Sequence, residues 1–446
     1  MSSLRVSENQ LLDLFHHGIQ NVQPSNILKN FLKVSGKNIK ISHKNSYKIY
    51  KNFNKIFLIC IGKASIDMAT TAYSILNNFA DNISDVIVVV NKENFKNVPG
   101  FTCFSSGHPI PNKKGLEASK YIEQRLKMTM KNDLVLVFLS GGGSALLPYP
   151  VSNIKLDEKI KINKLLLASG ANIIEINTVR KHLSKIKGGN LLKMSHPSKV
   201  HTLILSDVVG DDLSSISSGL TVPDETTFGD VKKILTKYRI WTKTPVSIRS
   251  HIEKGLKDLK LETPNKKNKI FNNSCNTIIG SNLMCLKSIH QYCKLKKIPS
   301  KLWKVNIEED VEILAKKFVE DLKKYINSKP IVLISGGETT VKLKGKGKGG
   351  RNQEFAIHFI RNINKLIPSI EYSLLSAGTD GRDGPTDAAG ALVNNKSINL
   401  ILEKKIDLDK EINNNNSYKV LKKINSLVIM SGTNTNVADL QLLLIK

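Results

Sequence analysis

The chain has 446 residues, 40% hydrophobic and 24% charged, so it is long enough for two globular domains with separate cores. Its longest apolar runs, VIVVV at residues 86–90 and LVLVFL at residues 134–139, are strand-sized and argue against a membrane protein. The formal net charge of +29 suggests nucleic-acid binding, but only eight of the 67 basic residues are arginines and no nucleic-acid-binding motif occurs, so we interpret the charge as a solvated lysine surface.

The N-terminal sequence, MSSLRVSENQLLDLF, has neither an apolar segment nor a small-residue cleavage signal, so we expect no secretion. The five cysteines form no CxxC pair and predict neither a disulfide framework nor a zinc site. We therefore predict a cytoplasmic protein that acts on a small molecule, with no membrane or nucleic-acid partner. Homo-oligomerisation stays open.

Short apolar runs alternate with helical stretches along the chain, which is typical of parallel α/β layers. In the first half we predict strands at residues 55–62, 85–90, 134–140 and 201–207, and helices at 64–77, 113–127 and 173–194. In the second half we predict strands at residues 276–280, 301–307, 330–337 and 372–378, and helices beginning near Ser281, Glu308 and Asn352.

The polar, proline-bearing segment LETPNKKNK separates the two halves and marks the expected domain boundary. The predicted fold is α/β, with two Rossmann-like domains built on mostly parallel sheets. The domains are residues 1–245 and 271–446, joined by a polar linker at residues 246–270. We expect the active site in a cleft between them.

Four predicted strands run directly into glycine followed by hydroxyl, amide or carboxylate groups: GGGSALL, GGETTV, VVGDD and TDGRDG. Tight turns need glycine in any case, but ligands bind at the carboxyl ends of parallel strands, and four such turns predict a binding site there. The candidate nucleotide-binding residues at the first two turns are Gly141, Gly142, Gly143, Ser144, Gly336 and Gly337.

The stretch GKGKGGRNQEFAI places a glycine- and lysine-rich loop before a helix with an apolar stripe. Unpaired N–H groups and the dipole of a helix N-terminus favour anions, so we expect Gly349, Gly350 and Asn352 to approach an anionic group of a ligand. The run formally contains GxGxxG, but no acidic residue follows at the required distance, and no Walker-type loop occurs. The prediction is anion binding without a dinucleotide fold.

Cations and carboxylates of the other motifs complete the candidate site. Lys63 in ICIGKASIDMA follows a strand and suits a transferring phosphoryl group. The spacing in NTVRKHLSKIKGG predicts one helical face, which carries Asn177, Arg180, Ser184 and Lys187. Carboxylates can hold Mg²⁺ or accept a substrate hydroxyl proton, and the candidates are Asp207, Asp211, Asp212, Glu338, Asp380, Asp383 and Asp387. His108, in SSGHPIPN, suits a structural role in a turn as well as a catalytic one.

Nine blocks together resemble the class II glycerate kinase family, whose C-terminal part is called the MOFRL domain. They run in family order from about residue 55 to the end: IGKASIDMA, SSGHPIPN, FLSGGGSALLPYP, EINTVRKHLSKIKGGNLL, LSDVVGDDLSSISSGLTVPD, ISGGETTV, GKGGRNQEFAI, SAGTDGRDGPTDAAGA and TNTNVADL. The resemblance implies ATP-dependent phosphorylation of D-glycerate, with 2-phosphoglycerate as the usual product. Lys63 and Arg351 match the family's basic active-site positions.

The residues and the resemblance together suggest roles. Lys63 and Arg351 would neutralise the γ-phosphate of ATP, and Asp207 or Asp380 would orient or deprotonate the 2-hydroxyl of glycerate. Arg180, with Asn177, would clamp the glycerate carboxylate. Mg²⁺ would be bound by Glu338 or by one of the aspartates, Asp211 and Asp383.

Four positions depart from the family pattern. A proline is usual at Leu220, an apolar or small residue at Arg382, a glycine at Asn434 and an asparagine at Ala438. One rival function is an NAD(P)H-dependent hydroxypyruvate reductase, a label sometimes given to such sequences, but the chain offers no credible dinucleotide fingerprint. The other rival is the charge-driven nucleic-acid binder.

Overall fold

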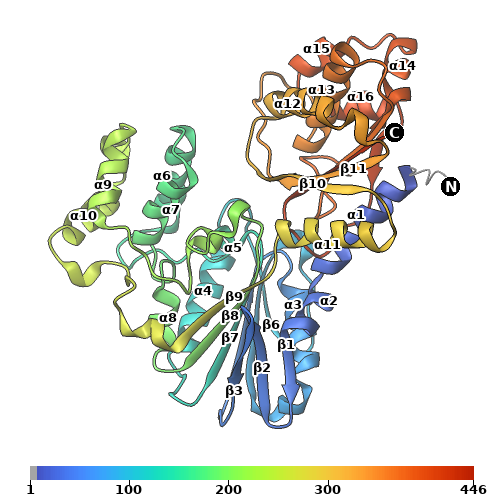
Figure 1. Cartoon of the computed structure of the whole chain (residues 1–446). Helices are drawn as coiled ribbons and strands as arrows, with labels where there is room; N and C mark the ends of the chain where they lie inside the picture. The colour runs from blue at the N-terminus through green and yellow to red at the C-terminus, as the bar shows by residue number, and fades with distance from the viewer. Residues whose placement is uncertain (1–7) are drawn as a thin grey trace. The chain divides into compact units, whose positions relative to one another are not determined.

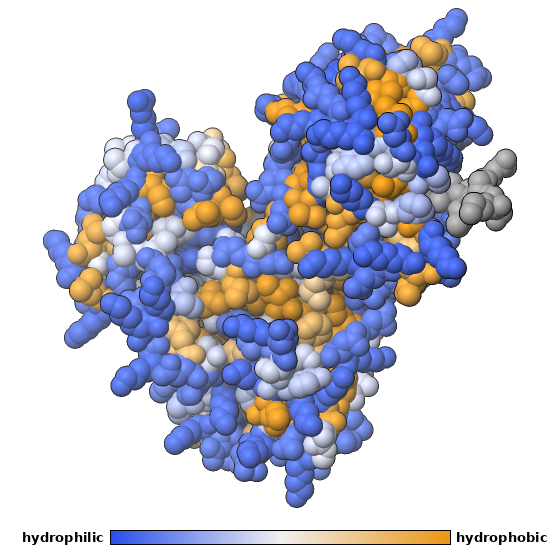
Figure 2. Space-filling model, in the orientation of Figure 1, coloured by the Kyte–Doolittle hydropathy of each residue, from blue (hydrophilic) through white to orange (hydrophobic). Residues whose placement is uncertain are grey.

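The computed structural model describes residues 8–446, which divide into two compact units (Figure 1). The middle unit is Ile27–Ile279, and the terminal unit combines residues 8–26 with Gly280–Lys446. None of the helices in residues 8–446 is both long and apolar enough to cross a bilayer. Hydrophilic residues dominate the face drawn in Figure 2, and apolar residues appear there in small groups.

The two units differ from the predicted domains at both predicted boundaries. Helix α1 (Glu8–Val22) packs on α11 (Asn282–Leu295), and a Cβ atom at Gly18 would lie only 2.6 Å from Cδ1 of Ile289. The N-terminal helix therefore belongs with the C-terminal part of the chain. The predicted linker at residues 246–270 is folded, because α10 (Val246–Gly255) packs on α9 (Phe228–Lys237).

The middle unit is built on a six-stranded sheet of order β6-β5-β4-β7-β8-β9, in which the first five strands are parallel neighbours. Strands β4 and β7 are buried along their whole length, which explains their continuous apolar sequences. The strands are β4 (Ile56–Ile61), β5 (Ile83–Asn91), β6 (Thr102–Ser106), β7 (Leu134–Leu139), β8 (Lys199–Leu205) and β9 (Ser274–Gly280).

Helices cover this sheet. Helices α4 (Lys113–Leu126) and α8 (Asn190–Ser195) share a core with one face, and α3 (Ser65–Ile75) contacts β4, β5 and β7. Beside them lies a small antiparallel sheet of β1 (Leu32–Ser35), β2 (Asn38–His43) and β3 (Ser46–Tyr50), which follows α2 (Pro24–Phe31).

A separate helical cluster carries part of the candidate site. It consists of α6 (Leu156–Ala168), α7 (Ile173–His182), α9 and α10, which share a core of their own away from the sheet (Figure 1). The single helix predicted at residues 173–194 is wrong: it is broken into α7 and α8. Gly188 and Gly189 lie between them with φ of 57° and 78°, a conformation that a helix does not adopt.

The terminal unit contains a mixed six-stranded sheet of order β10-β11-β15-β12-β13-β14. Strands β10 and β11 are parallel, whereas β15, the last strand of the chain, is antiparallel to both β11 and β12. The strands are β10 (Ser300–Ile307), β11 (Ile331–Gly337), β12 (Tyr372–Gly378), β13 (Ala388–Asn394), β14 (Leu427–Ile429) and β15 (Asp439–Ile445).

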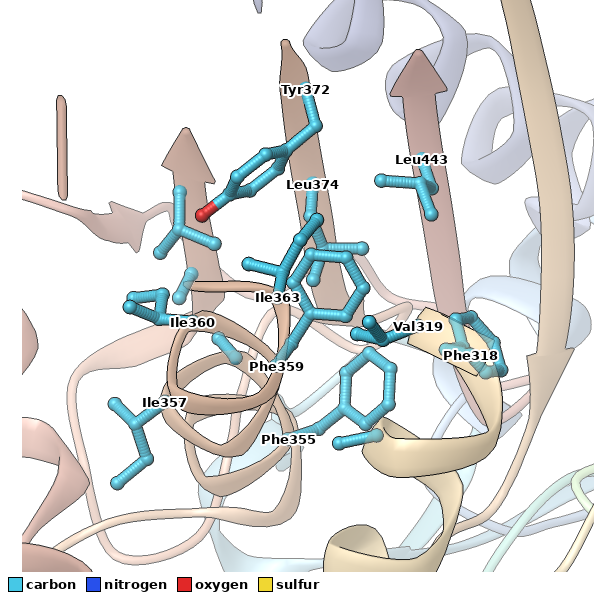
Figure 3. Close-up of a cluster of buried hydrophobic side chains, with 14 of the residues drawn as sticks. Phe318, Val319, Phe355, Ile357, Phe359, Ile360, Ile363, Tyr372, Leu374 and Leu443 are labelled. Atoms are coloured by element: carbon cyan, nitrogen blue, oxygen red, sulfur yellow. The ribbon is translucent and has the colours of Figure 1, made fainter. Parts of the chain in front are cut away.

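The core of the terminal unit lies between this sheet and two helices, α12 (Val311–Leu322) and α13 (Arg351–Leu366) (Figure 3). Phe359 of α13 faces Tyr372 and Leu374 of the sheet, with its ring centroid 5.4 Å from that of Tyr372. Phe355 packs against Phe318 of α12, with the ring centroids 5.1 Å apart. Three short helices complete the unit: α14 (Asn395–Glu403), α15 (Leu408–Asn413) and α16 (Ser417–Lys423). The predicted α/β class and all eight predicted strands are confirmed. The predicted parallel pairing holds for the first five strands of the middle sheet, but in the terminal sheet β12, β13 and β14 pair antiparallel, and β15 is inserted antiparallel between β11 and β12.

Two of the departures from the family pattern occupy strained backbone. Asn434 has φ of 59° and Ala438 has φ of 64°, in the left-handed region that residues with a side chain avoid. Asparagine tolerates this region better than most residues, but alanine pays about 1–2 kcal/mol there. The glycine and asparagine expected from the resemblance at these two positions would suit this backbone better than alanine does at position 438.

Ala438→Gly is expected to raise the free energy of unfolding by about 0.5–1 kcal/mol, because relief of the left-handed strain exceeds the entropy that glycine adds to the unfolded chain. Urea unfolding measures the change. Ala377→Gly, within strand β12, is the matched control and should lower stability by about the same amount. Equal losses in both variants would show that Ala438 is unstrained.

Candidate functional site

Lys63 lies at the carboxyl end of β4, next to the glycine turn that follows β7. Gly62 has φ of 129°, and a Cβ atom there would lie 2.4 Å from the carbonyl oxygen of Ser140. The Lys63 N–H donates to the Gly141 carbonyl (2.9 Å), and the Ala64 N–H donates to Ser140 Oγ (3.0 Å). These bonds hold Lys63 beside the turn, directly after a strand, which is where the sequence predicted it.

His108 packs against the same turn. A Cβ atom at Gly142 would lie 2.9 Å from Cδ2 of His108 and 3.6 Å from Cγ of Lys63, and Gly142 has φ of 87°. Burial, and then the charge of Lys63, lower the pKa of His108, so its ring is neutral at pH 7. A neutral imidazole next to Lys63 is a candidate for hydrogen bonding to a ligand.

A hydroxyl cluster surrounds the start of the short helix α5 (Gly143–Leu146). Lys187 Nζ donates to the carbonyl oxygen of Ser144 (2.8 Å) and to its Oγ (3.2 Å). Ser144 Oγ lies 2.8 Å from Ser218 Oγ, which in turn donates to Asn177 Oδ1 (3.0 Å). The structure therefore brings together three predicted site residues, Asn177, Ser144 and Lys187.

Three cations in this region, Lys159, Arg180 and Lys187, form no ion pair with a carboxylate of residues 8–446. Arg180 donates only to the amide oxygens of Asn163 (2.8 Å) and Asn177 (3.4 Å), and Lys159 Nζ donates to the Leu183 carbonyl (3.2 Å). Lys187 is 1% exposed. Throughout residues 8–446, no aspartate or glutamate forms an ion pair with any of the three.

The electrostatic effect of this arrangement is strong. Burial and the charge of Arg180 lower the pKa of Lys159 to about 7. Burial, followed by Lys159 and Arg180, lowers the pKa of Lys187 well below its ordinary value. A buried cation without a counterion costs free energy that an anionic ligand recovers. The cluster therefore has the charge of an anion-binding site.

The segment after β8 also contributes Ser217 and Ser218 to the hydroxyl cluster around α5, and the sequence did not single out these two residues. Ser217 and Ser218 have φ of 51° and 57°, and such strained non-glycine residues gather at functional sites. Ser217 Oγ is buried and has no hydrogen-bond partner within residues 8–446. It lies only 2.2 Å from where a Cβ atom on Gly143 would be. Sequence reasoning also missed Lys159 and Asn163; the hydroxyl-rich block SSISSG was the available signal for the two serines.

Ser184 does not share a helical face with Asn177 and Arg180, because α7 ends at His182. Its hydroxyl donates to the Tyr149 carbonyl (3.2 Å), and its backbone forms an isolated bridge with Pro150. Ser184 thus anchors the segment that leads to Lys187. The turn after β8 carries Asp207 and Asp211, both half-buried, and Asp211 has φ of 58°.

In the terminal unit, Arg351 begins α13 and is held by two carboxylates. Its Nε donates to Asp439 Oδ2 (2.5 Å), its NH2 donates to Asp439 Oδ1 (3.1 Å), and its NH1 donates to Glu338. Asp439 is 1% exposed. Burial raises the pKa of Asp439, and Arg351 opposes this shift. The charge of Arg351 is therefore compensated within the unit.

The N-terminus of α13 is already capped by a carboxylate. Asp383, which is 3% exposed, accepts hydrogen bonds from the N–H groups of Asn352 (3.1 Å) and Gln353 (2.9 Å). Burial and the neighbouring Asp439 raise the pKa of Asp383 to about 6, although the two N–H groups oppose this. A Cβ atom at Gly350 would lie 2.2 Å from Cγ of Asp383. Asp383 thus acts as a helix cap, a different task from the predicted metal binding.

The glycine-lysine loop before α13 binds another segment of its own chain. Asn415 Oδ1 accepts from the N–H groups of Lys344 (2.6 Å) and Gly345 (3.0 Å), and the Asn414 carbonyl accepts from Gly347 (2.8 Å). A Cβ atom at Gly347 would lie 2.4 Å from that carbonyl. These glycines are required because the asparagine segment docks directly on their backbone.

The remaining predicted residues of the terminal unit lie at strand ends or at the start of α13. A Cβ atom at Gly337 would meet the Ile307 backbone at 2.3 Å, and one at Gly336 would meet Asn282 Oδ1 at 2.5 Å. Asn352 Oδ1 accepts from Ser376 Oγ (2.7 Å), while Gly349 packs on Ser417. Asp380 follows β12 and accepts the N–H of Arg382 (3.0 Å).

The predicted metal ligands do not form one cluster. No group of three or more His, Cys, Asp or Glu side chains within residues 8–446 is arranged to hold a metal ion. Glu338 pairs with Arg351 and Asp383 caps α13, both in the terminal unit, whereas Asp211 belongs to the middle unit. Binding of Mg²⁺ through one or two carboxylates and ligand phosphates remains compatible with these residues.

A buried carboxyl on α13 itself, that of Glu354, makes stability depend on pH. Glu354 is 2% exposed, and neither carboxyl oxygen has a hydrogen-bond partner within the described chain. Desolvation is the main cause that raises the pKa of Glu354 from 4.5 to about 7. Since the folded state holds the proton more tightly than the unfolded state, stability falls as the pH rises from about 4.5 to about 7.

Glu354→Gln is therefore expected to raise the free energy of unfolding at pH 8 by up to about 3 kcal/mol and to have little effect at pH 4.5. Denaturant unfolding at both pH values measures this. Glu312→Gln is the control: Arg361 and Lys344 outweigh desolvation and lower the pKa of Glu312, so this variant should lose stability at pH 8. Equal changes for Glu354→Gln at both pH values would contradict the shift.

Known proteins share both the sequence and the fold of this chain. Residues 10–253 match a family described as a domain of unknown function, DUF4147, and residues 331–439 match the MOFRL family. A glycerate 2-kinase of Pyrococcus horikoshii is 38% identical, covering 96% of this chain and 94% of its own length. A D-glycerate 2-kinase of Thermotoga maritima is 36% identical, covering 87% and 90%. A crystal structure of a glycerate kinase from Thermotoga maritima superposes with a TM-score of 0.83 at 32% identity, covering 98% of this chain and 99% of that one.

Proposed function

Because the chain belongs to the class II glycerate kinase family, we propose that it transfers the γ-phosphoryl group of ATP to the 2-hydroxyl of D-glycerate, giving 2-phosphoglycerate and ADP. Relatives that match it over nearly their whole length are named for this substrate and this position. The single observation in the structure that carries the proposal is the cluster of Lys159, Arg180 and Lys187, which lacks a carboxylate partner within residues 8–446.

Glycerate is a carboxylate, and the half-buried guanidinium of Arg180 suits it. Guanidinium groups present paired N–H donors that match the two oxygens of a carboxylate. Asn177, which already accepts from Arg180 and Ser218, orients this donor. Lys187 lies behind Ser144 and supplies positive charge in a low-dielectric environment, where charge interactions are stronger than in water. Ser217 Oγ offers a further buried group for a ligand.

Phosphoryl transfer leaves the protein mainly positioning and charge neutralisation. In the proposed reaction the 2-hydroxyl oxygen bonds to Pγ, the bond from Pγ to the bridging oxygen of ADP breaks, and Asp207 or Asp380 takes the hydroxyl proton. Lys63, at the β4 turn, neutralises charge on the γ-phosphoryl oxygens, and the Gly141–Ser144 turn approaches the phosphates. Arg351 is the other proposed cation for the phosphoryl group, within the limits set by its two carboxylates.

Mg²⁺ would neutralise phosphate charge when bound. Asp211 and Glu338 are the proposed ligands from this chain, each acting with phosphate oxygens, as is usual for kinases. Asp383 is left out of this set because its oxygens accept the first-turn N–H groups of α13.

The direct test is phosphorus NMR after incubation with ATP, Mg²⁺ and D-glycerate. The expected products are ADP and 2-phosphoglycerate; formation of 3-phosphoglycerate would overturn the assigned hydroxyl. A parallel incubation with NADH and hydroxypyruvate tests the reductase alternative, and loss of NADH with no release of ADP would reverse the proposal. Binding of nucleic acid that survives moderate salt would favour the other alternative, a charge-driven nucleic-acid-binding protein.

A further inference from the structure

The middle unit contains a cavity of about 660 Å³ that the proposed reaction does not use. Its wall is formed by α4 and α8 on the sheet side, and by α10 and the short helix Leu259–Leu261 on the side of the helical cluster. Of the predicted site residues, Ser184 lines this wall, whereas Ser144 and Lys187 do not. The volume is in the range of small-molecule binding sites.

The wall of this cavity is strongly basic. Lys185, Lys193, Lys254 and Lys260 line it, and none of them forms an ion pair with a carboxylate anywhere in residues 8–446. The wall contains one carboxylate, Glu123, which already accepts from Tyr149 and pairs with Lys127 at 2.9 Å. The uncompensated charge of the wall is therefore positive.

Lysine abundance alone does not account for this wall. The chain has 59 lysines in 446 residues, about one in eight, whereas six of the 19 residues that line the cavity are lysines, about one in three. The others include short hydroxyl and amide side chains, such as Ser250 and Asn190, that donate to phosphate oxygens. Lysine ammonium groups are compact point charges well suited to phosphate.

We propose that this basic cavity is a second, non-catalytic binding site for a phosphorylated small molecule carrying at least two negative charges. The assignment goes beyond the proposed function and does not require it, since it rests on the charge and volume of a different cavity.

One wall residue connects the cavity to the candidate active site. Asn190 Nδ2 donates to the carbonyl oxygens of Lys187 (2.9 Å) and Ser184 (3.4 Å). A ligand that binds the Asn190 amide competes with these two hydrogen bonds. It therefore affects the position of the segment that carries Lys187. Occupancy of the cavity is therefore expected to change the kinetics of the active site, whichever reaction that site performs.

Hydrogen–deuterium exchange of the full chain with pyrophosphate as the probe tests the site. We expect protection in peptides that cover residues 190–194 and 247–261. The Kd for pyrophosphate should rise about tenfold in the double variant Lys254→Gln/Lys260→Gln and with added salt, because both changes weaken the electrostatic attraction.

The matched control is Lys232→Gln/Lys233→Gln on α9, which removes the same charge from the same helical cluster outside the cavity wall. It should leave the Kd unchanged. An equal rise of the Kd in the two double variants would mean only general attraction of pyrophosphate to a basic protein. Exchange protection confined to residues 140–144 and 217–219 would mean binding at the active site only. Either result overturns the proposal, and neither depends on measured kinase activity.

Discussion

Lys187→Met is expected to lower kcat/KM for D-glycerate by about 10²-fold or more while leaving the protein at least as stable as the wild type. The ammonium group is buried behind Ser144 with no carboxylate partner in the described chain, so it costs free energy in the unliganded protein. Methionine keeps the volume and removes the charge. Steady-state kinetics and thermal unfolding of the same preparations measure both effects.

Lys181→Met is the matched control, with the opposite expectation. Lys181 is also buried, at 5% exposed against 1% for Lys187, but it pairs with Asp224 at 3.3 Å. Its loss leaves a buried carboxylate without its cation, which costs about 3–5 kcal/mol of stability. Turnover of the folded fraction should be retained. If Lys187→Met loses stability and keeps its kcat/KM, the lysine is structural and the anion-binding assignment fails.

Local patterns were sufficient to predict the strand ends that carry the site. The sequence around Lys63 predicted a strand, a glycine turn and a helix, and the structure has β4, Gly62 and α3 there. Each of these features depends on residues close together in the chain. The break between α7 and α8 was also encoded locally, by Gly188 and Gly189, although the helical spacing of polar residues concealed it.

Long-range pairing explains what the sequence did not predict. The partner of Arg351 is Asp439, 88 residues later, and the partner of Gly345 is Asn415, 70 residues later. The local sequence of the glycine-lysine loop does not show whether the loop is free or docked on an asparagine segment. Ser217 joined the candidate site only because the fold places it against Gly143. Assignment of anion binding from a loop therefore requires knowledge of which N–H groups the protein already uses.

Arg351→Ala is expected to lower the free energy of unfolding by about 3–5 kcal/mol, because it leaves Asp439 buried without its cation. Arg361→Ala, on the same helix, is the control. The two arginine side chains are almost equally exposed, at 33% and 32%, and each contacts two carboxylates. They differ in those carboxylates: Asp439 is 1% exposed, whereas Glu312 and Asp409 are 46% and 75% exposed. Solvent-screened pairs contribute little, so Arg361→Ala should cost about 1 kcal/mol or less.

Loss of stability would by itself obscure a kinetic role for Arg351, so a double variant separates the two. Arg351→Met/Asp439→Leu removes the buried charge together with its partner and should recover most of the lost stability. If Arg351 acts on the transferring phosphoryl group, kcat stays about 10²-fold below the wild type in the stable double variant. Recovery of kcat together with stability would assign Arg351 to the architecture of the terminal unit alone and would leave Lys63 as the proposed cation for the phosphoryl group.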